Sequence, residues 1–463
     1  MLTRRTFVAS AAALAALPAV AAEQSETRYP AAAVRDDLDA IWSALIDVGV
    51  DPFQTADRAV VERLYQESRK RMIADLTLRE AWLAIAPVLG ALNDGHVGLG
   101  YPDPLNAAAR RFPLRFALSD TDAVVVRSDR TQTIPIGSTL VSVDGIPAEI
   151  FRATALASLG GQTRALRRSR VTGSGPLASV ALFGDKPSYA VAWIASDGAT
   201  HTAPIAARAA TPGSADPVVA PYAYRTLENG SVGLIDYRSC EDQQKFITFL
   251  TTTLDAINAA PIRALIVDIR QNGGGDSSLN DLLWENFSTK AFKQFGGVAV
   301  KSCARLKREY GREKYVRYYG QRAWDAADGT IFHDGGDPHA DLIVHPADND
   351  PQWYKGKIYL LIGPATFSSA MSCALAAKDY GLATIVGEET GEPVESTGEV
   401  YTFTSPQLGL RAYLTTKVFL PPKPHPPGQG VVPDVIVPTT LADRAAGRDP
   451  VLERTLALIA ASS

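Results

Sequence analysis

Residues 264–275 read Ala-Leu-Ile-Val-Asp-Ile-Arg-Gln-Asn-Gly-Gly-Gly. The first six residues are an almost continuous apolar run, which is typical of a parallel strand covered on both faces. The three glycines that follow allow a tight turn in which the backbone approaches a neighbouring group closely. A helix is expected next, from about Ser277 to Phe287. This order of strand, turn and helix indicates an α/β unit built on a parallel sheet.

The same alternation extends over residues 225–463. We expect a strand at 232–237, a helix at 243–257, and a second buried strand at 358–362 that leads through the turn 363–369 into a helix ending near Lys378. A strand at 435–437 and a helix with Asp449 as N-cap and Pro450 at its first position close the chain. Residues 225–463 are therefore predicted to form one α/β domain.

Two further domains are predicted before it. Residues 30–112 are assigned to a helical domain, because residues 30–93 follow a 3.6-residue apolar period and Thr77 with Glu80 forms a capping-box pattern. Residues 113–210 alternate apolar and polar residues between glycines, which favours a small β-rich domain with one helix near 148–159. Residues 290–350 are polar, and we expect an irregular insertion over one face of the α/β domain.

The N-terminal residues 1–22 predict an export signal. A charged start is followed by a 16-residue apolar run, Phe7–Ala22, and small residues suited to cleavage. Spanning a bilayer takes about 20 apolar residues, so a membrane span is not expected. Arg4 and Arg5 favour the twin-arginine type of signal, with a general secretory signal as the alternative. A periplasmic or secreted location is the expectation.

Composition restricts the function further. The 463 residues include 46 lysines and arginines and 50 aspartates and glutamates, a formal net charge of −4. Removal of residues 1–22 takes away two arginines and no acids, so the charge becomes −6. Neither value gives the basic footprint that nucleic-acid binding needs. The three cysteines permit at most one disulfide, and Cys373 is expected to be an inert residue of a buried helix.

A candidate nucleophile lies at the start of the helix after the second turn. Ser368 there would benefit from the helix dipole and from unpaired backbone N–H groups. The amide of Ser369 is then a candidate oxyanion donor, and the glycine turn, through Gly274 or Gly275, would supply a second. Helix capping by Ser368 and simple turn formation by the glycines are the competing interpretations.

A serine nucleophile needs a base, and His96 is the candidate among six histidines. It follows Asp94-Gly95 in a tight turn after a long helix, where functional residues are common. The other five lie in polar or glycine- and proline-rich surroundings typical of surface residues.

Together these segments resemble the tail-specific (C-terminal processing) and tricorn-core serine peptidases. The matching motifs are Asp268-Ile-Arg-Gln-Asn-Gly-Gly-Gly, Thr366-Phe-Ser-Ser-Ala, Val386-Gly-Glu-Glu-Thr-Gly, Gly430-Val-Val-Pro-Asp and the histidine motif Leu92-Asn-Asp-Gly-His. Residues 135–145 resemble the PDZ-like segment that often precedes the catalytic domain. The resemblance implies a crotonase/ClpP-like spiral α/β catalytic domain with an N-terminal helical domain and a PDZ-like domain.

The resemblance also implies roles for the residues. Ser368 would be the nucleophile, His96 the general base, and the amides of Ser369 and of Gly274 or Gly275 the oxyanion hole. Peptides or unfolded proteins would be the substrates, with no metal or organic cofactor. The oligomeric state stays open.

The chain departs from the family pattern at three places. Pro393 stands where the Ser/Lys branch has its lysine, which disfavours that mechanism. Gly95 replaces a serine before the histidine. The orienting glutamate is expected at 426–428, where the sequence is Pro-Pro-Gly. The remaining candidates for a third catalytic residue are Glu388, Glu389 and Glu399, which the sequence does not rank.

The sequence gives little support for other functions. The glycine turn lacks the spacing of a dinucleotide site, and no Gly-x-Ser-x-Gly elbow of the common esterases is present. A metal site at residues 333–339, with His333 and His339, lacks recognised zinc spacing. The main rival is a catalytically inactive periplasmic protein that binds peptides or other ligands, and a different acyl hydrolase on the same scaffold is a third possibility.

Overall fold

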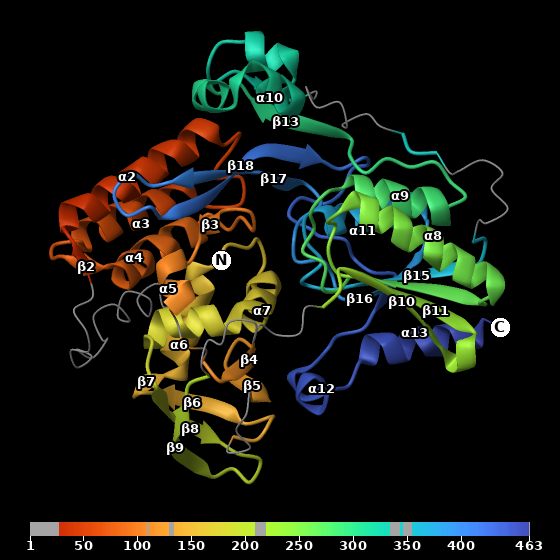
Figure 1. Cartoon of the computed structure of the whole chain (residues 1–463), viewed down its shortest axis with the longest axis horizontal. Helices are drawn as coiled ribbons and strands as arrows, with labels where there is room; N and C mark the ends of the chain where they lie inside the picture. Colours follow the sequence, from red (N-terminus) through yellow and green to blue (C-terminus); the bar gives the residue numbers. More distant parts are fainter. Residues whose placement is uncertain are drawn as a thin grey trace. The chain divides into compact units, whose positions relative to one another are not determined.

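The computed structural model describes residues 27–108, 110, 112–128, 134–208, 219–333, 343–345 and 354–462 (Figure 1). It divides into two compact units. Unit 1 comprises residues 1–216, 399–415 and 440–448, and unit 2 comprises residues 217–398, 416–439 and 449–463. The predicted signal at residues 1–22 lies outside the described residues.

Unit 1 begins with helices and continues into an antiparallel sheet. Its elements are β1 (Arg28–Tyr29), α2 (Ala31–Val48), α3 (Arg58–Arg71), β2 (Leu76–Thr77), α4 (Leu78–Gly90), β3 (Gly98–Leu99), α5 (Asp103–Ala108), β4 (Leu114–Leu118), β5 (Ala123–Ser128), β6 (Thr139–Val143), β7 (Ile146–Pro147), α6 (Ala148–Ser158), α7 (Arg164–Phe183), β8 (Ser188–Ile194), β9 (Thr200–Ala206) and, late in the chain, α12 (Leu441–Ala446). The predicted helices of residues 30–93 are confirmed. The capping box is present, because Thr77 Oγ1 accepts from the Glu80 amide and Glu80 accepts from the Thr77 amide.

The sheet of unit 1 has the strand order β4-β5-β6-β8-β9, with β7 paired to β6. The predicted helix near 148–159 is α6, but the expectation of a single helix there was wrong, because α7 follows it. Glycines and a proline between 173 and 176 disguised α7 in the sequence. The helix is stabilised by tertiary packing: the ring of Phe183 at its end lies 5.4 Å from the rings of both Phe112 and Phe151.

Unit 2 contains the predicted α/β alternation. Its elements are β10 (Tyr222–Leu227), the short 3-10 helix η1 (Glu228–Gly230), β11 (Val232–Tyr237), α8 (Gln243–Ala259), β12 (Ala264–Asp268), α9 (Ser278–Phe287), β13 (Gly297–Lys301), α10 (Ala304–Asp325), β14 (Ile331–Phe332), β15 (Lys357–Ile362), α11 (Ser369–Tyr380), β16 (Thr384–Gly387), β19 (Val435–Ile436) and α13 (Pro450–Ala461). The main sheet has the order β10-β11-β12-β15-β16-β19 and is parallel from β11 onward. A second sheet, β14-β13-β18-β17, includes β17 (Ser396–Thr404) and β18 (Arg411–Leu420), which each contain residues of both units.

Helices cover both faces of the main sheet (Figure 1). On one face, α8, α9 and α11 bury residues such as Phe246, Leu283 and Cys373 against the strands. On the other face, Val451 and Ile459 of α13 are buried in a separate cluster. Because successive side chains of a strand point to opposite faces, a strand buried on both faces must be apolar throughout. This requirement explains the continuous apolar runs of β12 and β15.

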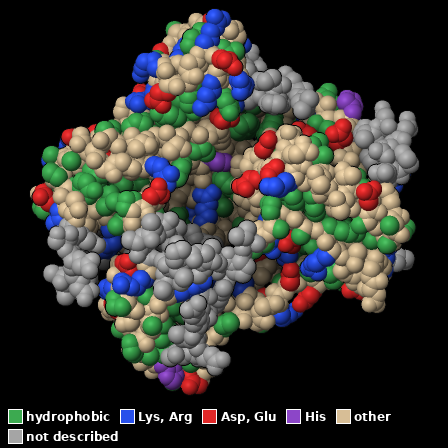
Figure 2. Space-filling model, viewed as in Figure 1, with side chains coloured by type: hydrophobic (Ala, Val, Ile, Leu, Met, Phe, Trp, Pro, Cys, Tyr) green, Lys and Arg blue, Asp and Glu red, His purple; other side chains and the backbone are tan. Residues whose placement is uncertain are grey.

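The expectation that residues 290–350 are irregular was wrong where the structure describes them. They contain β13, β14 and the 22-residue α10, which is kinked at Gly311 and Gly320. Acidic and basic side chains are intermixed on the surface of α10 (Figure 2). The sequence of this helix therefore has little apolar periodicity. Buried tyrosines stabilise it instead: the rings of Tyr315 and Tyr319 lie 4.8 Å apart, and the Tyr319 hydroxyl is 2.9 Å from Thr416 Oγ1.

The three cysteines are free thiols and are buried. Cys373 lies in α11 with no exposed surface, as predicted for a buried helix, and burial raises the pKa of its thiol. Among the described helices, none is long and apolar enough to cross a membrane.

Candidate active site

Two strand-to-helix turns lie next to each other in unit 2. The parallel strands β12 and β15 are hydrogen-bonded neighbours, and they lead into turns at residues 269–276 and 363–368. In parallel α/β sheets, ligands bind beyond the carboxyl ends of the strands. The predicted nucleophile and both predicted glycine donors are therefore at the edge of the sheet where chemistry is expected.

Hydrogen bonds join the two turns. The Phe367 amide donates to the Asn272 carbonyl at 3.1 Å. Thr366 Oγ1 donates to the Ile269 carbonyl at 3.0 Å, and Ser369 Oγ donates to the Gly275 carbonyl at 2.6 Å. Three contacts spread along both turns fix the position of one turn relative to the other.

Ser368 has an unusual backbone. It precedes α11 with φ 55° and ψ −128°, a backbone conformation that residues other than glycine rarely adopt. Such strain costs on the order of 1–3 kcal/mol and persists only where the surroundings enforce it, most often at functional sites. The Ser368 side chain is neither fully buried nor fully exposed. Strain of this kind at the N-terminus of a helix favours a functional serine over a simple helix cap, and Ser368 makes no side-chain capping bond.

Gly274 lies directly against the serine. A Cβ atom at this position would meet Ser368 Cβ at 2.6 Å and the Ser369 nitrogen at 2.9 Å, and φ is +96°. Its own N–H group, however, donates to Asn272 Oδ1 at 2.8 Å. Gly274 therefore allows the close approach of the two turns, while its amide is committed within its own turn.

Gly275 differs from Gly274 in the hydrogen bonds around it. It forms an isolated parallel bridge with Cys240, in which the Cys240 amide donates to the Gly274 carbonyl and the Asp276 amide donates to the Cys240 carbonyl. The Gly275 amide takes no part in this bridge. Of the two glycines that the sequence left as alternatives, Gly275 is the better candidate for an oxyanion donor.

The buried Asn272 holds the glycine turn in place. It has no exposed surface, and its Nδ2 donates to the Tyr237 carbonyl at 3.1 Å while its Oδ1 accepts from Gly274. A buried polar side chain is stable only when it is hydrogen-bonded. Asn272 thereby connects the glycine turn to the end of β11.

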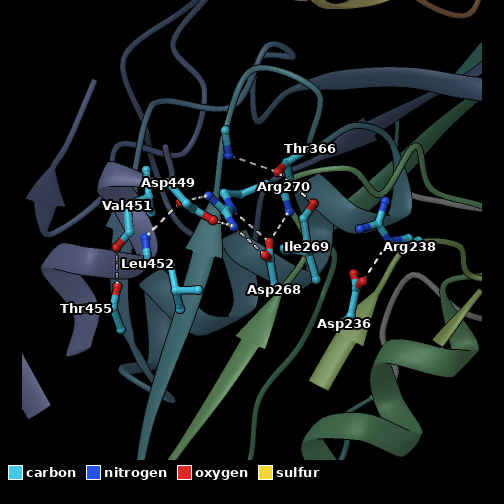
Figure 3. A network of polar contacts seen from close by, with 11 residues as sticks. Asp236, Arg238, Asp268, Ile269, Arg270, Thr366, Asp449, Val451, Leu452 and Thr455 are labelled. Carbon is cyan, nitrogen blue, oxygen red and sulfur yellow. Dashed lines mark hydrogen bonds and ion pairs between the residues drawn. The ribbon is translucent and has the colours of Figure 1, made fainter. Parts of the chain in front are cut away.

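Arg270 connects the same turn to α13 (Figure 3). Its guanidinium forms ion pairs with Asp268 and Asp449, each with a shortest N–O distance of 2.6 Å. Burial alone would lower the pKa of Arg270, but hydrogen bonds to the two carboxylates raise it. Burial would likewise raise the pKa of Asp449, and the hydrogen bonds from Arg270 lower it. Asp449 also caps α13 through the Leu452 amide, as the sequence predicted.

One carboxylate that the sequence reasoning missed contacts the nucleophile turn. Glu392 is fully buried, and its Oε2 accepts a hydrogen bond from the Ser368 amide at 2.6 Å. It adjoins Pro393, which stands where the Ser/Lys branch has a lysine, and this position was the one available sequence signal.

The glutamates proposed from the sequence lie elsewhere. Glu388 accepts from the Thr439 amide at 2.5 Å, and Glu389 accepts from the Gly430 amide at 2.8 Å. Glu399 lies in β17 and belongs to unit 1. Both Glu388 and Glu389 thus have structural contacts with the chain segment before and after β19.

His96 belongs to unit 1, whereas Ser368, Ser369, Gly274 and Gly275 belong to unit 2. The imidazole is almost fully buried, and Asp94 Oδ1 accepts from the His96 amide at 2.7 Å. Burial and, to a smaller extent, the charge of Arg170 lower the pKa of His96 to about 3. Arg170 is held nearby, because its Nη1 donates to the Gly95 and Gly160 carbonyls. The imidazole is therefore neutral at neutral pH, the state in which it can accept a proton.

Within the described ranges, no group of three or more histidine, cysteine, aspartate or glutamate side chains could hold a metal ion. The possible metal site at residues 333–339 cannot be described as a whole, because residues 334–339 lie outside the described residues.

The geometry of the two turns defines a class of protein. A serine strained at a helix N-terminus and facing a glycine turn is the arrangement of a serine hydrolase on an α/β sheet. Comparison with known proteins makes the class specific. Residues 231–437 match the model of peptidase family S41. No curated protein sequence matches the chain significantly.

Solved structures share the fold over most of the chain. Mature CPAF matches with a TM-score of 0.63 and 17% identity, over 92% of this chain and 97% of that chain. Mature CPAF in complex with lactacystin matches with a TM-score of 0.61 and 16% identity, over 92% and 98%. Residues 231–437 are thus similar to peptidase family S41, and the chain is a serine-type peptidase, as the motifs predicted.

Proposed function

We propose that this chain is an exported peptidase that hydrolyses peptide bonds through an acyl-enzyme on Ser368, with His96 as general base. The observation that carries the proposal is the strained Ser368 at the start of α11, held against the glycine turn. The proposed substrates are peptides or unfolded proteins, in keeping with the family.

The reaction follows from the groups present. The neutral His96 imidazole takes the hydroxyl proton as Ser368 Oγ attacks the carbonyl carbon of the scissile bond. The amides of Ser369 and Gly275 stabilise the negative oxygen of the tetrahedral intermediate, each donor contributing about 3–4 kcal/mol. Collapse of the intermediate breaks the C–N bond, and the imidazolium gives its proton to the leaving amine. Water then repeats the sequence on the ester and releases the acid.

The proposal extends to the finer domain assignment. We assign the catalytic domain to the crotonase/ClpP-like spiral architecture over residues 225–463. Residues 30–112 would form a helical domain, and residues 113–210, with their antiparallel sheet and α6, a PDZ-like domain.

The catalytic proposal is tested by labelling the purified mature protein with a fluorophosphonate probe. Wild type should be labelled, and Ser368→Ala and His96→Ala should both lose labelling and cleavage of an unfolded casein substrate. Ser277→Ala, which changes a serine directly after the glycine turn without a proposed role, is the matched control and should be labelled as wild type. Absence of labelling in folded wild type would exclude the peptidase mechanism and favour the ligand-binding alternative.

The proposed export needs its own experiment. Cell fractionation should find the mature chain outside the cytoplasm, and replacing Arg4 and Arg5 together by lysine should retain the precursor inside. Unchanged export of this double variant would instead indicate the general secretory type of signal.

A further inference from the structure

Glu392 is a carboxyl group without exposed surface, placed beside the nucleophile of the reaction proposed above. Burying a carboxyl group is costly unless it forms hydrogen bonds. Here Oε2 accepts the Ser368 backbone N–H at 2.6 Å. The contact joins residues 24 positions apart and belongs to neither a helix nor a strand ladder.

The loop that carries Glu392, residues 388–394, is fixed from the other side. Thr390 Oγ1 donates to the Glu392 carbonyl at 3.1 Å and accepts from the Val431 amide at 2.9 Å. The Thr390 amide donates to the Val431 carbonyl at 3.2 Å, and the Val394 amide donates to the Gln429 carbonyl at 2.9 Å. These bonds attach the 388–394 loop to the segment that precedes β19.

Gly430 shows how tightly this attachment is packed. A Cβ atom there would meet the Thr390 carbonyl oxygen at 2.5 Å, Thr390 Oγ1 at 2.6 Å and the Glu392 carbonyl oxygen at 3.0 Å. Two of these are backbone atoms that cannot move without moving the loop. A contiguous series of contacts therefore runs from Gly430 through Thr390 and Glu392 to the nucleophile.

The strained backbone of Ser368 explains why such support is needed. A serine at φ 55° relaxes unless the peptide groups on both sides are held. The Ser372 amide holds the Ser368 carbonyl at 3.1 Å, and Glu392 holds the Ser368 amide. Rotation of this backbone would redirect both the Ser368 hydroxyl and the Ser369 amide.

We propose that Glu392 is a positioning residue: its carboxylate holds the Ser368 amide, and thereby the orientation of the nucleophile and of the adjoining oxyanion donor. This inference rests on the proposed role of Ser368. It assigns the 388–394 loop and the Gly430–Val431 segment a shared task, which is to deliver this carboxylate to the serine.

Two substitutions of Glu392 separate positioning from charge. Glu392→Gln keeps a carbonyl oxygen that can accept the Ser368 N–H, so labelling by fluorophosphonate and kcat should stay within about 3-fold of wild type. Glu392→Ala removes the acceptor, and both should fall on the order of 100-fold, with KM changed by less than about 3-fold, because misplacement by about 1 Å has an effect of this size. Glu395→Ala, an exposed acid just after the same loop, is the matched control and should behave as wild type.

Two further measurements distinguish a loss of positioning from a loss of folding. Thr390→Val removes the hydroxyl that holds the Glu392 carbonyl but leaves the carboxylate, and should give a loss between those of the glutamine and alanine variants. In protein labelled with ¹⁵N-serine, the Ser368 amide resonance, assigned by its absence in Ser368→Ala, should shift strongly upfield in Glu392→Ala and little in Glu392→Gln.

The outcomes separate this inference from the proposed function. A folded Glu392→Ala protein with wild-type labelling overturns the positioning role. A glutamine variant as impaired as the alanine variant overturns it too, since charge and not the hydrogen bond would then matter. If wild type itself is not labelled, the proposed function fails and the positioning role fails with it, while the amide shift still reports whether the Glu392 bond exists.

Discussion

The turn that carries His96 follows a helix and keeps its imidazole neutral by burial, whereas the turn that carries Ser368 follows a strand and holds the serine by backbone strain and hydrogen bonds. In the histidine turn, burial and the nearby Arg170 exclude positive charge. In the serine turn, Glu392 accepts the Ser368 amide and Gly274 permits close approach. Burial and charge thus set the protonation state of His96, whereas hydrogen bonds and steric fit set the backbone geometry of Ser368. We therefore expect the histidine turn to respond to pH and the serine turn to respond to changes in side-chain size.

The largest effect is expected from steric change at the serine turn. Gly274→Ala would place a methyl group 2.6 Å from Ser368 Cβ at a φ of +96°, and should cost about 4 kcal/mol through strain and overlap combined, with at least a 100-fold loss of labelling. Gly273→Ala is the control, since its Cβ would meet no atom within 4 Å. Urea denaturation and probe labelling of both variants check this, and equal behaviour of the two would contradict the steric account.

The second-largest effect is expected from loss of Arg270, the arginine that connects the glycine turn to α13. Arg270→Ala leaves Asp268 and Asp449 without their partner, and we expect a loss of about 3 kcal/mol in the free energy of unfolding. Arg238→Ala breaks a more exposed pair with Asp236 and should cost less than about 1 kcal/mol. Chemical denaturation measures both, and a cost at Arg270 as small as that at Arg238 would refute the role assigned to the network.

The third prediction concerns the effect of His96 on the pH dependence of the free energy of unfolding. The pKa of His96 is about 3 in the folded protein and about 6.5 when unfolded, so below pH 6.5 the unfolded state binds a proton that the folded state does not. The free energy of unfolding should therefore fall as pH drops, by about 2 kcal/mol from this residue between about pH 7.5 and pH 5. His96→Gln should lack this part of the slope.

Urea titrations of wild type and His96→Gln at several pH values measure the difference. His201→Gln, which removes an exposed imidazole from β9, is the control for loss of a histidine. Identical slopes for wild type and His96→Gln would show that burial does not hold the imidazole neutral.

The smallest effect is expected where only one hydrogen bond between the two turns is removed. Ser369→Ala deletes the donor to the Gly275 carbonyl but keeps the Ser369 amide, so stability should fall by about 1 kcal/mol and labelling by less than 10-fold. Thermal unfolding and labelling rates check this. A loss as large as that of Gly274→Ala would mean that the hydroxyl itself takes part in the chemistry.

The predictable and unpredictable parts of the fold differ in the range of the contacts behind them. The glycine turn, the helix after Ser368 and the Asp449 cap were predicted, because strand periodicity and turn or cap chemistry act within a few residues. Helix α10 was not, because its stability comes from tertiary contacts such as that between Tyr319 and Thr416, 97 positions apart. Helix α7 was missed for the same reason.

The candidate site divides in the same way. The sequence by itself determined the serine, the glycines and the histidine as candidates, since each occupies a turn whose residue types and order are visible locally. Only the tertiary structure decided that Asn272 occupies the Gly274 amide, that Glu392 and not Glu388 or Glu389 supports Ser368, and that burial keeps His96 neutral. Hydrogen-bond partners and pKa values depend on which distant groups meet and on how much water is excluded, and neither is written in the local order of residues.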